Sequence, residues 1–126
     1  MGLFSFNKNK ENKKLNWTEI STEEQLEKAL ATTSEKPAVF FKHSTRCSIS
    51  SMALNRFENE WESDSSDAEL YFIDLIAYRN VSNALAQKLN VEHQSPQVIA
   101  VKNGEVVYAD SHNGISASKT KTKLSQ

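Results

Sequence analysis

The sequence has few residues of the types that cross-link a chain or interrupt regular secondary structure: one cysteine, two prolines and three glycines in 126 residues. One cysteine cannot form a disulfide within the chain, which excludes a disulfide-stabilised secreted module, and we expect a reducing, cytoplasmic compartment. No apolar run is long enough to span a bilayer, so no membrane partner is expected. A net charge of -1 gives no reason to expect nucleic acid as a partner.

The length fits one domain. Residues 7–14 form a polar, mostly basic run without apolar periodicity, so we expect residues 1–14 to be a flexible arm. Residues 15–126 are expected to form the domain, with disorder in about the last eight residues. A monomer is the expected state.

Apolar patterning predicts strands that alternate with helices. Ser21 and Glu24 form a predicted capping box for a helix that ends near Thr33. The apolar run 38–42 is typical of a strand covered on both faces. The other expected segments are an edge strand over 15–20, a helix over 48–62 with exposed Arg56, Glu58, Glu60 and Glu62, a strand over 69–75, and a helix over 79–89.

Asn103-Gly104 lies between two apolar runs and predicts a type I′ turn, because both central residues of that turn need φ > 0. A short helix could follow Gly114. Crossovers followed by a hairpin predict an α/β fold in which a central mixed sheet has helices on both faces.

The single cysteine comes where a strand ends in a polar turn and a helix begins. The apolar residues of this helix recur at helical spacing and are expected to face the core; they are Ile49, Met52, Ala53, Phe57 and Trp61. The free backbone N–H groups at a helix start favour an anion, and the thiolate is the nucleophilic form of cysteine. The alternative is a buried Cys47 that acts as a small hydrophobe.

These features describe a thioredoxin-like fold, and short motifs narrow the resemblance. The chain resembles the bacillithiol-system monothiol bacilliredoxin family (YtxJ-type) over roughly residues 15–118. The segments that carry the resemblance are 41–50, Asp74, Arg79, 81–83, 93–97 and 111–112. The family pattern places proline directly after the cysteine, where this chain has Ser48.

The resemblance implies a monothiol oxidoreductase. The Cys47 thiolate would attack the disulfide between a client protein and bacillithiol, or a similar low-molecular-weight thiol, which acts as co-substrate. A dithiol enzyme would resolve the adduct with a cysteine three residues along, where this chain has Ser50. An external thiol or another redoxin must therefore resolve it.

Four residues are candidates for supporting the thiolate. Arg46 could stabilise it or meet carboxylates of the bound small thiol. Thr45 and Ser50 could donate hydrogen bonds to the sulfur, although hydroxyls near a helix start are commonly caps. Ser48 can cap or start the helix in place of proline.

Substrate contacts are expected from Arg46, His43, Ser95 and Pro96. On the resemblance, Pro96 is predicted to be cis, which would place the Ser95 backbone beside the thiol, where an extended substrate could pair with it. His43 could also be an ordinary, partly exposed strand-end histidine.

The remaining polar candidates have simpler interpretations. Asp74 could accept a proton through water or bind a loop backbone. His93 and His112 are expected to be structural or surface residues. Three widely spaced histidines and one cysteine are no zinc signature, so neither a metal site nor a permanently bound cofactor is predicted.

Two other functions remain open. The first is a non-catalytic thioredoxin-like module that binds clients along the Pro96 edge, which Ser48 favours. The second is an iron–sulfur cluster carrier in which Cys47 of two subunits and two small thiols supply four ligands.

Overall fold

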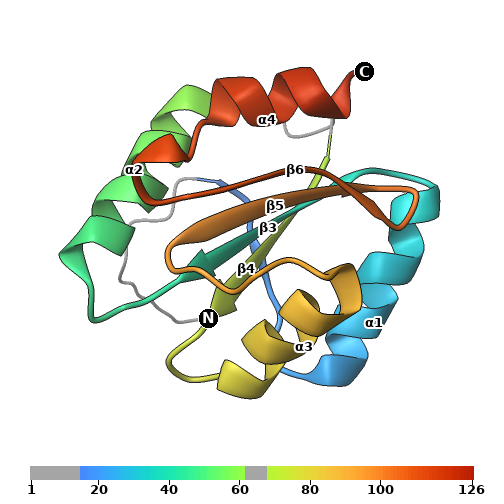
Figure 1. Cartoon of the computed structure of the whole chain (residues 1–126), viewed down its shortest axis with the longest axis horizontal. Coiled ribbons are helices and arrows are strands. Elements are labelled where there is room, and N and C mark those ends of the chain that lie inside the picture. Colours follow the sequence, from blue (N-terminus) through green and yellow to red (C-terminus); the bar gives the residue numbers. More distant parts are fainter. Residues whose placement is uncertain (1–14, 62–67) are drawn as a thin grey trace.

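Figure 1 shows a computed structural model of the chain, which describes residues 15–61 and 68–126. The described strands form one five-stranded sheet of order β2-β4-β3-β5-β6. Strands β2, β4 and β3 are parallel, and β5 is antiparallel to β3 and to β6. The strand bounds are β2 Thr18–Glu19, β3 Ala38–His43, β4 Glu69–Asp74, β5 Gln97–Lys102 and β6 Glu105–Ser111.

Helices cover both faces of this sheet, which confirms the predicted α/β fold. In Figure 1, α2 and α4 lie on one side of the sheet and α1 and α3 on the other. The helix bounds are α1 Glu23–Ala31, α2 Ser48–Trp61, α3 Arg79–Leu89 and α4 Ala117–Leu124, with short 3-10 turns η2 Thr32–Ser34 and η4 His112–Gly114. None of these helices combines the length and apolar character needed to cross a bilayer.

Strand β3 is the centre of the core, and all six of its residues are buried. Alternate side chains of a strand point to opposite faces. Val39 and Phe41 therefore pack under α2 and α4, whereas Ala38 and Phe40 pack under α1 and α3. The prediction of a strand covered on both faces is confirmed.

The start of α1 corrects one local prediction. Thr22, not Ser21, is the N-cap, and its hydroxyl accepts a hydrogen bond from Gln25 N at 3.1 Å. Gln25 Oε1 in turn accepts from Ser21 N at 2.8 Å. The capping box is therefore displaced by one residue, from Ser21 and Glu24 to Thr22 and Gln25, because the Gln25 side chain accepts the backbone hydrogen bond before the helix.

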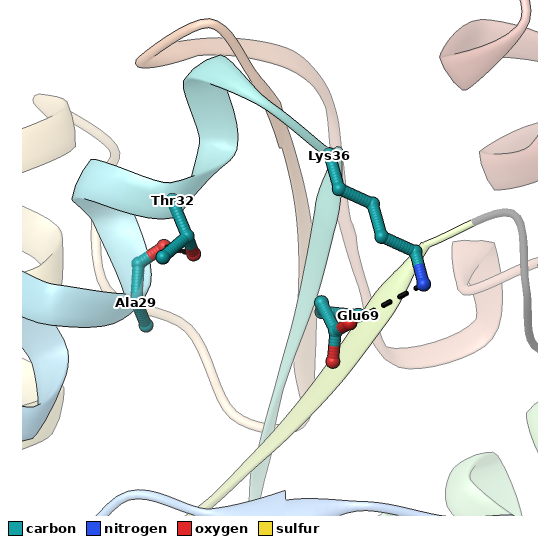
Figure 2. A network of polar contacts seen from close by, with 4 residues as sticks. All are labelled: Ala29, Thr32, Lys36 and Glu69. Atoms are coloured by element: carbon teal, nitrogen blue, oxygen red, sulfur yellow. Dashed lines mark hydrogen bonds and ion pairs between the residues drawn. The ribbon is translucent and has the colours of Figure 1, made fainter.

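The end of α1 leads into the sheet (Figure 2). The Thr32 hydroxyl donates to the Ala29 carbonyl at 2.8 Å, where α1 gives way to η2 instead of continuing to Thr33 as predicted. Lys36 Nζ then lies 3.2 Å from Glu69 Oε2, beside the starts of β3 and β4. Both side chains of this pair are partly exposed, so it contributes little to stability.

The predicted edge strand is shorter than expected and leads from an aromatic cluster. Only Thr18–Glu19 pairs with β4, and the preceding Trp17 packs against Phe41, Phe57 and Phe72. Trp17 Nε1 also donates to Glu58 Oε2 at 2.7 Å. Glu58 is therefore buried, and the prediction that it is exposed is wrong.

Helix α2 buries only part of its predicted apolar face. Ala53, Phe57 and Trp61 are in the core, but Ile49 is 53% exposed and Met52 is 66% exposed. The prediction that these two residues face the core is wrong. The predicted last residue of this helix, at position 62, lies outside the described residues.

The closing hairpin and the C-terminal helix complete the sheet. Asn103 and Gly104 have φ of 55° and 76°, so the predicted turn between β5 and β6 is confirmed. Ser116 caps α4 by accepting from Lys119 N at 3.1 Å, and Leu124 is buried. The structure thus describes the short helix that the sequence allows after Gly114, and this helix includes most of the last eight residues, for which disorder is the other expectation. The expected arm at 1–14 lies outside the described residues.

Candidate functional site

Cys47 lies at the N-cap position of α2, on the turn that follows β3. Its N–H donates to Ser44 O at 3.2 Å, and its carbonyl accepts from Ser51 N at 3.1 Å, which is the first hydrogen bond of the helix. The Cys47 side chain is half-buried rather than enclosed in the core. It is therefore accessible enough to react, unlike the small core hydrophobe of the alternative interpretation.

Beneath the turn, Ser50 and His43 form a fully buried polar pair. Ser50 Oγ lies 2.7 Å from His43 Nδ1 and accepts a hydrogen bond from Ser44 N at 3.0 Å. The His43 ring also packs against Phe72, with 5.4 Å between ring centroids. The expectation of a partly exposed His43 is wrong, and a buried imidazole has no surface to offer a client, which also removes its expected substrate contact.

The position of the proton between Ser50 and His43 determines whether the Ser50 hydroxyl can donate a hydrogen bond to the Cys47 sulfur. If His43 Nδ1 accepts, the Ser50 proton is engaged with the imidazole. If Nδ1 carries its own proton, Ser50 Oγ accepts both bonds and its hydroxyl proton is available elsewhere. The predicted donation from Ser50 to the Cys47 sulfur therefore requires the second tautomer.

The other predicted supporting residues lie on the surface of the same turn. Thr45, Arg46 and Ser48 are all exposed and flank Cys47 in the chain. Charged and hydroxyl groups next to a half-buried sulfur can interact with a thiolate or with a molecule attached to it. Their roles remain predictions.

The Ser95–Pro96 peptide bond is cis, as the resemblance predicts. Lys42 of β3 pairs with Gln97 of the antiparallel β5, so the chain enters β5 at the same end of the sheet where it leaves β3 toward Cys47. The left side of Figure 1 shows these ends together with the end of β6. His112 N donates to Pro96 O at 3.2 Å and so joins the segment after β6 to this edge.

A groove of about 270 Å³ lies between α2 and η4. Arg56 crosses from one wall to the other, because its Nη2 donates to His112 O at 3.1 Å. The groove starts two residues after Cys47, and sequence reasoning missed it by assigning its apolar residues to the core. The lining residues are Ile49, Met52, Ala53, Arg56, His112 and Asn113.

Sequence reasoning also missed Lys42, whose side chain is fully buried. Burial lowers the pKa of Lys42 to about 8. Its Nζ lies 3.2 Å from His93 Nδ1, which lies 3.4 Å from Ser82 Oγ. Burial first, and then the charges of Lys42 and Arg79, lower the pKa of His93. Lys42 is the only charged residue in the run 38–42, which is predicted to be covered on both faces, and this position was the available signal.

Asp74 takes the second of its two expected roles. Its Oδ1 accepts hydrogen bonds from Ile76 N at 3.1 Å and Ala77 N at 3.2 Å, in the loop after β4. Across residues 15–61 and 68–126, no group of three or more histidine, cysteine or acidic side chains is placed to hold a metal ion.

Comparison with known proteins matches this chain to one family. The family model described as monothiol bacilliredoxin BrxC matches residues 18–120. Among solved structures, a proposed oxidoreductase with a thioredoxin fold is 29% identical, with a TM-score of 0.71 over 86% of this chain and 92% of that chain.

Two thioredoxins share the fold at lower identity. Malassezia sympodialis thioredoxin is 18% identical, with a TM-score of 0.67 over 90% of this chain and 91% of that one. Schistosoma mansoni thioredoxin is 23% identical, with a TM-score of 0.65 over 87% and 94% of the two chains. The thioredoxin-like fold predicted from the sequence is thus confirmed.

Proposed function

This chain belongs to the monothiol bacilliredoxin family, and on that premise we propose that it removes bacillithiol, or a similar low-molecular-weight thiol, from mixed disulfides on client proteins. Its family and fold are those of thiol redox proteins. The observation that carries the proposal is the lone Cys47, half-buried at the start of α2.

The reaction consists of two thiol–disulfide exchanges. In the first, the Cys47 thiolate attacks the bacillithiol sulfur of the mixed disulfide, the S–S bond breaks, and the client leaves as a thiolate. Cys47 then carries bacillithiol as a new mixed disulfide. In the second, the thiolate of another small thiol attacks the bacillithiol sulfur, which forms a small-molecule disulfide and returns Cys47 as a thiolate.

The second exchange needs an external thiol because the chain has no other sulfhydryl. Ser50, three residues after Cys47, is fully buried and hydrogen-bonded to Ser44 N. A hydroxyl cannot form a disulfide, so the adduct on Cys47 persists until a thiol arrives from solution. The lone cysteine and the buried Ser50 together support a monothiol mechanism.

The residues around Cys47 have separate roles in this proposal. Exposed Arg46 balances the thiolate or a carboxylate on the small thiol, while Thr45 and Ser48 offer hydroxyl donors at the helix start. The backbone of Ser95, next to Pro96, pairs with an extended client segment.

The test is intact mass spectrometry of the protein mixed with a bacillithiolated model peptide. The expected result is a mass increase of one bacillithiol on the protein and release of the reduced peptide. Cys47→Ala should show neither change, and Ser51→Ala, which alters the neighbouring half-exposed serine, should behave as the parent. An unmodified parent protein beside an intact peptide adduct contradicts the proposal.

A non-catalytic binding module is the second candidate, because exposed Ile49 and Met52 line a groove next to the thiol. This module would bind the bacillithiolated peptide without exchange. In the same experiment it predicts an unchanged protein mass, while fluorescence anisotropy shows equal peptide affinity for the parent and Cys47→Ala.

A further inference from the structure

We propose that Lys42 is a positioning residue, which holds the Ser95–Pro96 segment against the Cys47 turn through its contact with His93. The inference rests on the proposed function in one respect, namely that the segment held in place binds a client next to Cys47. The contact itself is a property of the fold.

The Lys42–His93 contact has a defined direction. An ammonium group has only donors, so at neutral pH Lys42 Nζ donates to His93 Nδ1 across their 3.2 Å separation. His93 must then accept at Nδ1 and carry its proton on Nε2. Because Lys42 lies on the central strand and is fully buried, the donor has a rigid base.

Gln97 provides a second anchor for the same loop. Gln97 pairs with Lys42 between β5 and β3, so the two side chains begin from adjacent positions. Gln97 Nε2 donates to Glu92 O at 3.0 Å, and Gln97 Oε1 accepts from Gln94 N at 3.3 Å. Three successive loop residues, Glu92, His93 and Gln94, are thus held by the paired strands immediately before the chain reaches the Ser95–Pro96 segment.

The charges around this contact are mostly positive. Arg79 at the start of α3 acts on His93 together with Lys42. Asp74 at the end of β4 binds loop N–H groups, and Glu92 is exposed. Among residues 15–61 and 68–126, no carboxylate is ion-paired with Lys42. His93 is therefore the partner through which Lys42 acts.

The strength of the contact depends on pH at both ends of a range. Below the pKa of His93, which is lower than 6.5, a protonated imidazole faces an ammonium group and the contact becomes repulsive. As pH rises through the pKa of Lys42, about 8, the charge-assisted bond becomes a weaker neutral one. The loop is held best between these limits.

The test compares amide hydrogen exchange in the parent, Lys42→Met and Lys36→Met by mass spectrometry at pH 7. In Lys42→Met we expect exchange in residues 92–95 to accelerate by about tenfold, the effect of losing one hydrogen bond, while α2 is unchanged. Lys36, at the opposite end of β3, is the matched control and should leave both regions unchanged. Parent-like exchange in Lys42→Met overturns the proposal.

Kinetics with the bacillithiolated peptide give the second readout. Lys42→Met should raise KM about tenfold with little change in kcat, since the client contact is weakened and the sulfur chemistry is retained. The parent KM should be lowest between the two pKa values, and His93→Gln, which keeps an acceptor but does not titrate, should lose the rise at acid pH. The proposal is contradicted if KM of His93→Gln rises at acid pH as it does in the parent, or if KM of Lys42→Met is unchanged.

The two proposals can fail separately. An inactive parent with accelerated exchange in Lys42→Met rejects the oxidoreductase function and keeps the positioning role. An active parent, together with unchanged exchange and unchanged KM in Lys42→Met, keeps the oxidoreductase function and rejects the positioning role. If Lys42→Met does not fold, the pH dependence of loop exchange in the parent and His93→Gln carries the test. As pH falls below 6.5, exchange in the parent should accelerate relative to His93→Gln, and a ratio that stays constant down to the pH at which the parent unfolds overturns the positioning role.

Discussion

Lys42 is the residue whose proton affinity changes most clearly between the folded and unfolded chain. Burial lowers its pKa from 10.5 to about 8. Between these values the unfolded chain binds more protons, so the free energy of unfolding rises with pH. The full rise from this group is about 3 kcal/mol, reached when pH passes 10.5.

Lys42→Met should remove this dependence, because methionine fills a similar volume without a charge. Urea unfolding at pH 7, 8.5 and 10 is the measurement, and the difference in unfolding free energy between parent and variant removes the contribution of other groups. Relative to Lys42→Met, the parent should gain stability as pH rises. A difference that stays constant with pH contradicts the lowered pKa of the buried Lys42 ammonium.

At the same scale, the sequence identifies reactive residues better than buried polar ones. Cys47 is found because it is the only thiol, and its place at a helix start follows from the apolar pattern around it. Glu58 and His43 were expected on the surface, because their burial depends on Trp17 and Ser50, which come from other turns of the chain. A local pattern does not contain such tertiary partners.

The turn between β5 and β6 allows a clean test of one element. Gly104 has φ of 76°, and a Cβ there would meet no atom within 4 Å. Gly104→Ala should therefore lose about 1 to 2 kcal/mol of stability from backbone conformation alone. Asn103→Gly at the neighbouring left-handed position should be close to neutral. Chemical denaturation measures both, and equal stability of the two variants contradicts the backbone explanation.

Helix α2 shows why the presence of a helix is easier to predict than the burial of its side chains. Its helical period was read correctly, yet Ile49 and Met52 are exposed. Ile49 and Met52 line the groove between α2 and η4 instead of packing on the sheet. Periodicity tells which side chains share a face, but not how far the opposing sheet extends.

At the scale of the molecule, the two cores lie on opposite faces of one sheet and should unfold together. Leu85, on α3, is fully buried under the face opposite α2 and α4. Leu85→Ala should lose about 2 to 5 kcal/mol of stability. Trp17 and Trp61 lie on the other face, so coincident transitions by tryptophan fluorescence and circular dichroism would show that the loss is shared.

Gln87→Ala, an exposed change on the same helix, should shift stability by less than about 0.5 kcal/mol. Separate transitions by the two probes in Leu85→Ala would instead mean that the faces unfold independently.

The topology of the whole chain could be predicted because each step follows from a local signal. The buried run 38–42 and the Asn103-Gly104 turn define the central strands and the closing hairpin. The arrangement of side chains at the end of β3 could not be predicted in this way. It depends on which loop, strand and helix meet there, as Lys42, His93 and Ser82 show.

The lone Cys47 above a buried Ser50 has a consequence for how the protein would respond to the small-thiol pool. A dithiol protein that closes its own disulfide is reduced by two small thiols, so its oxidised fraction depends on the square of their concentration. A protein with one sulfur is oxidised only as an adduct, and its occupancy follows the simple ratio of small disulfide to small thiol. On the proposed mechanism, diluting the pool at constant ratio would leave the state of Cys47 unchanged.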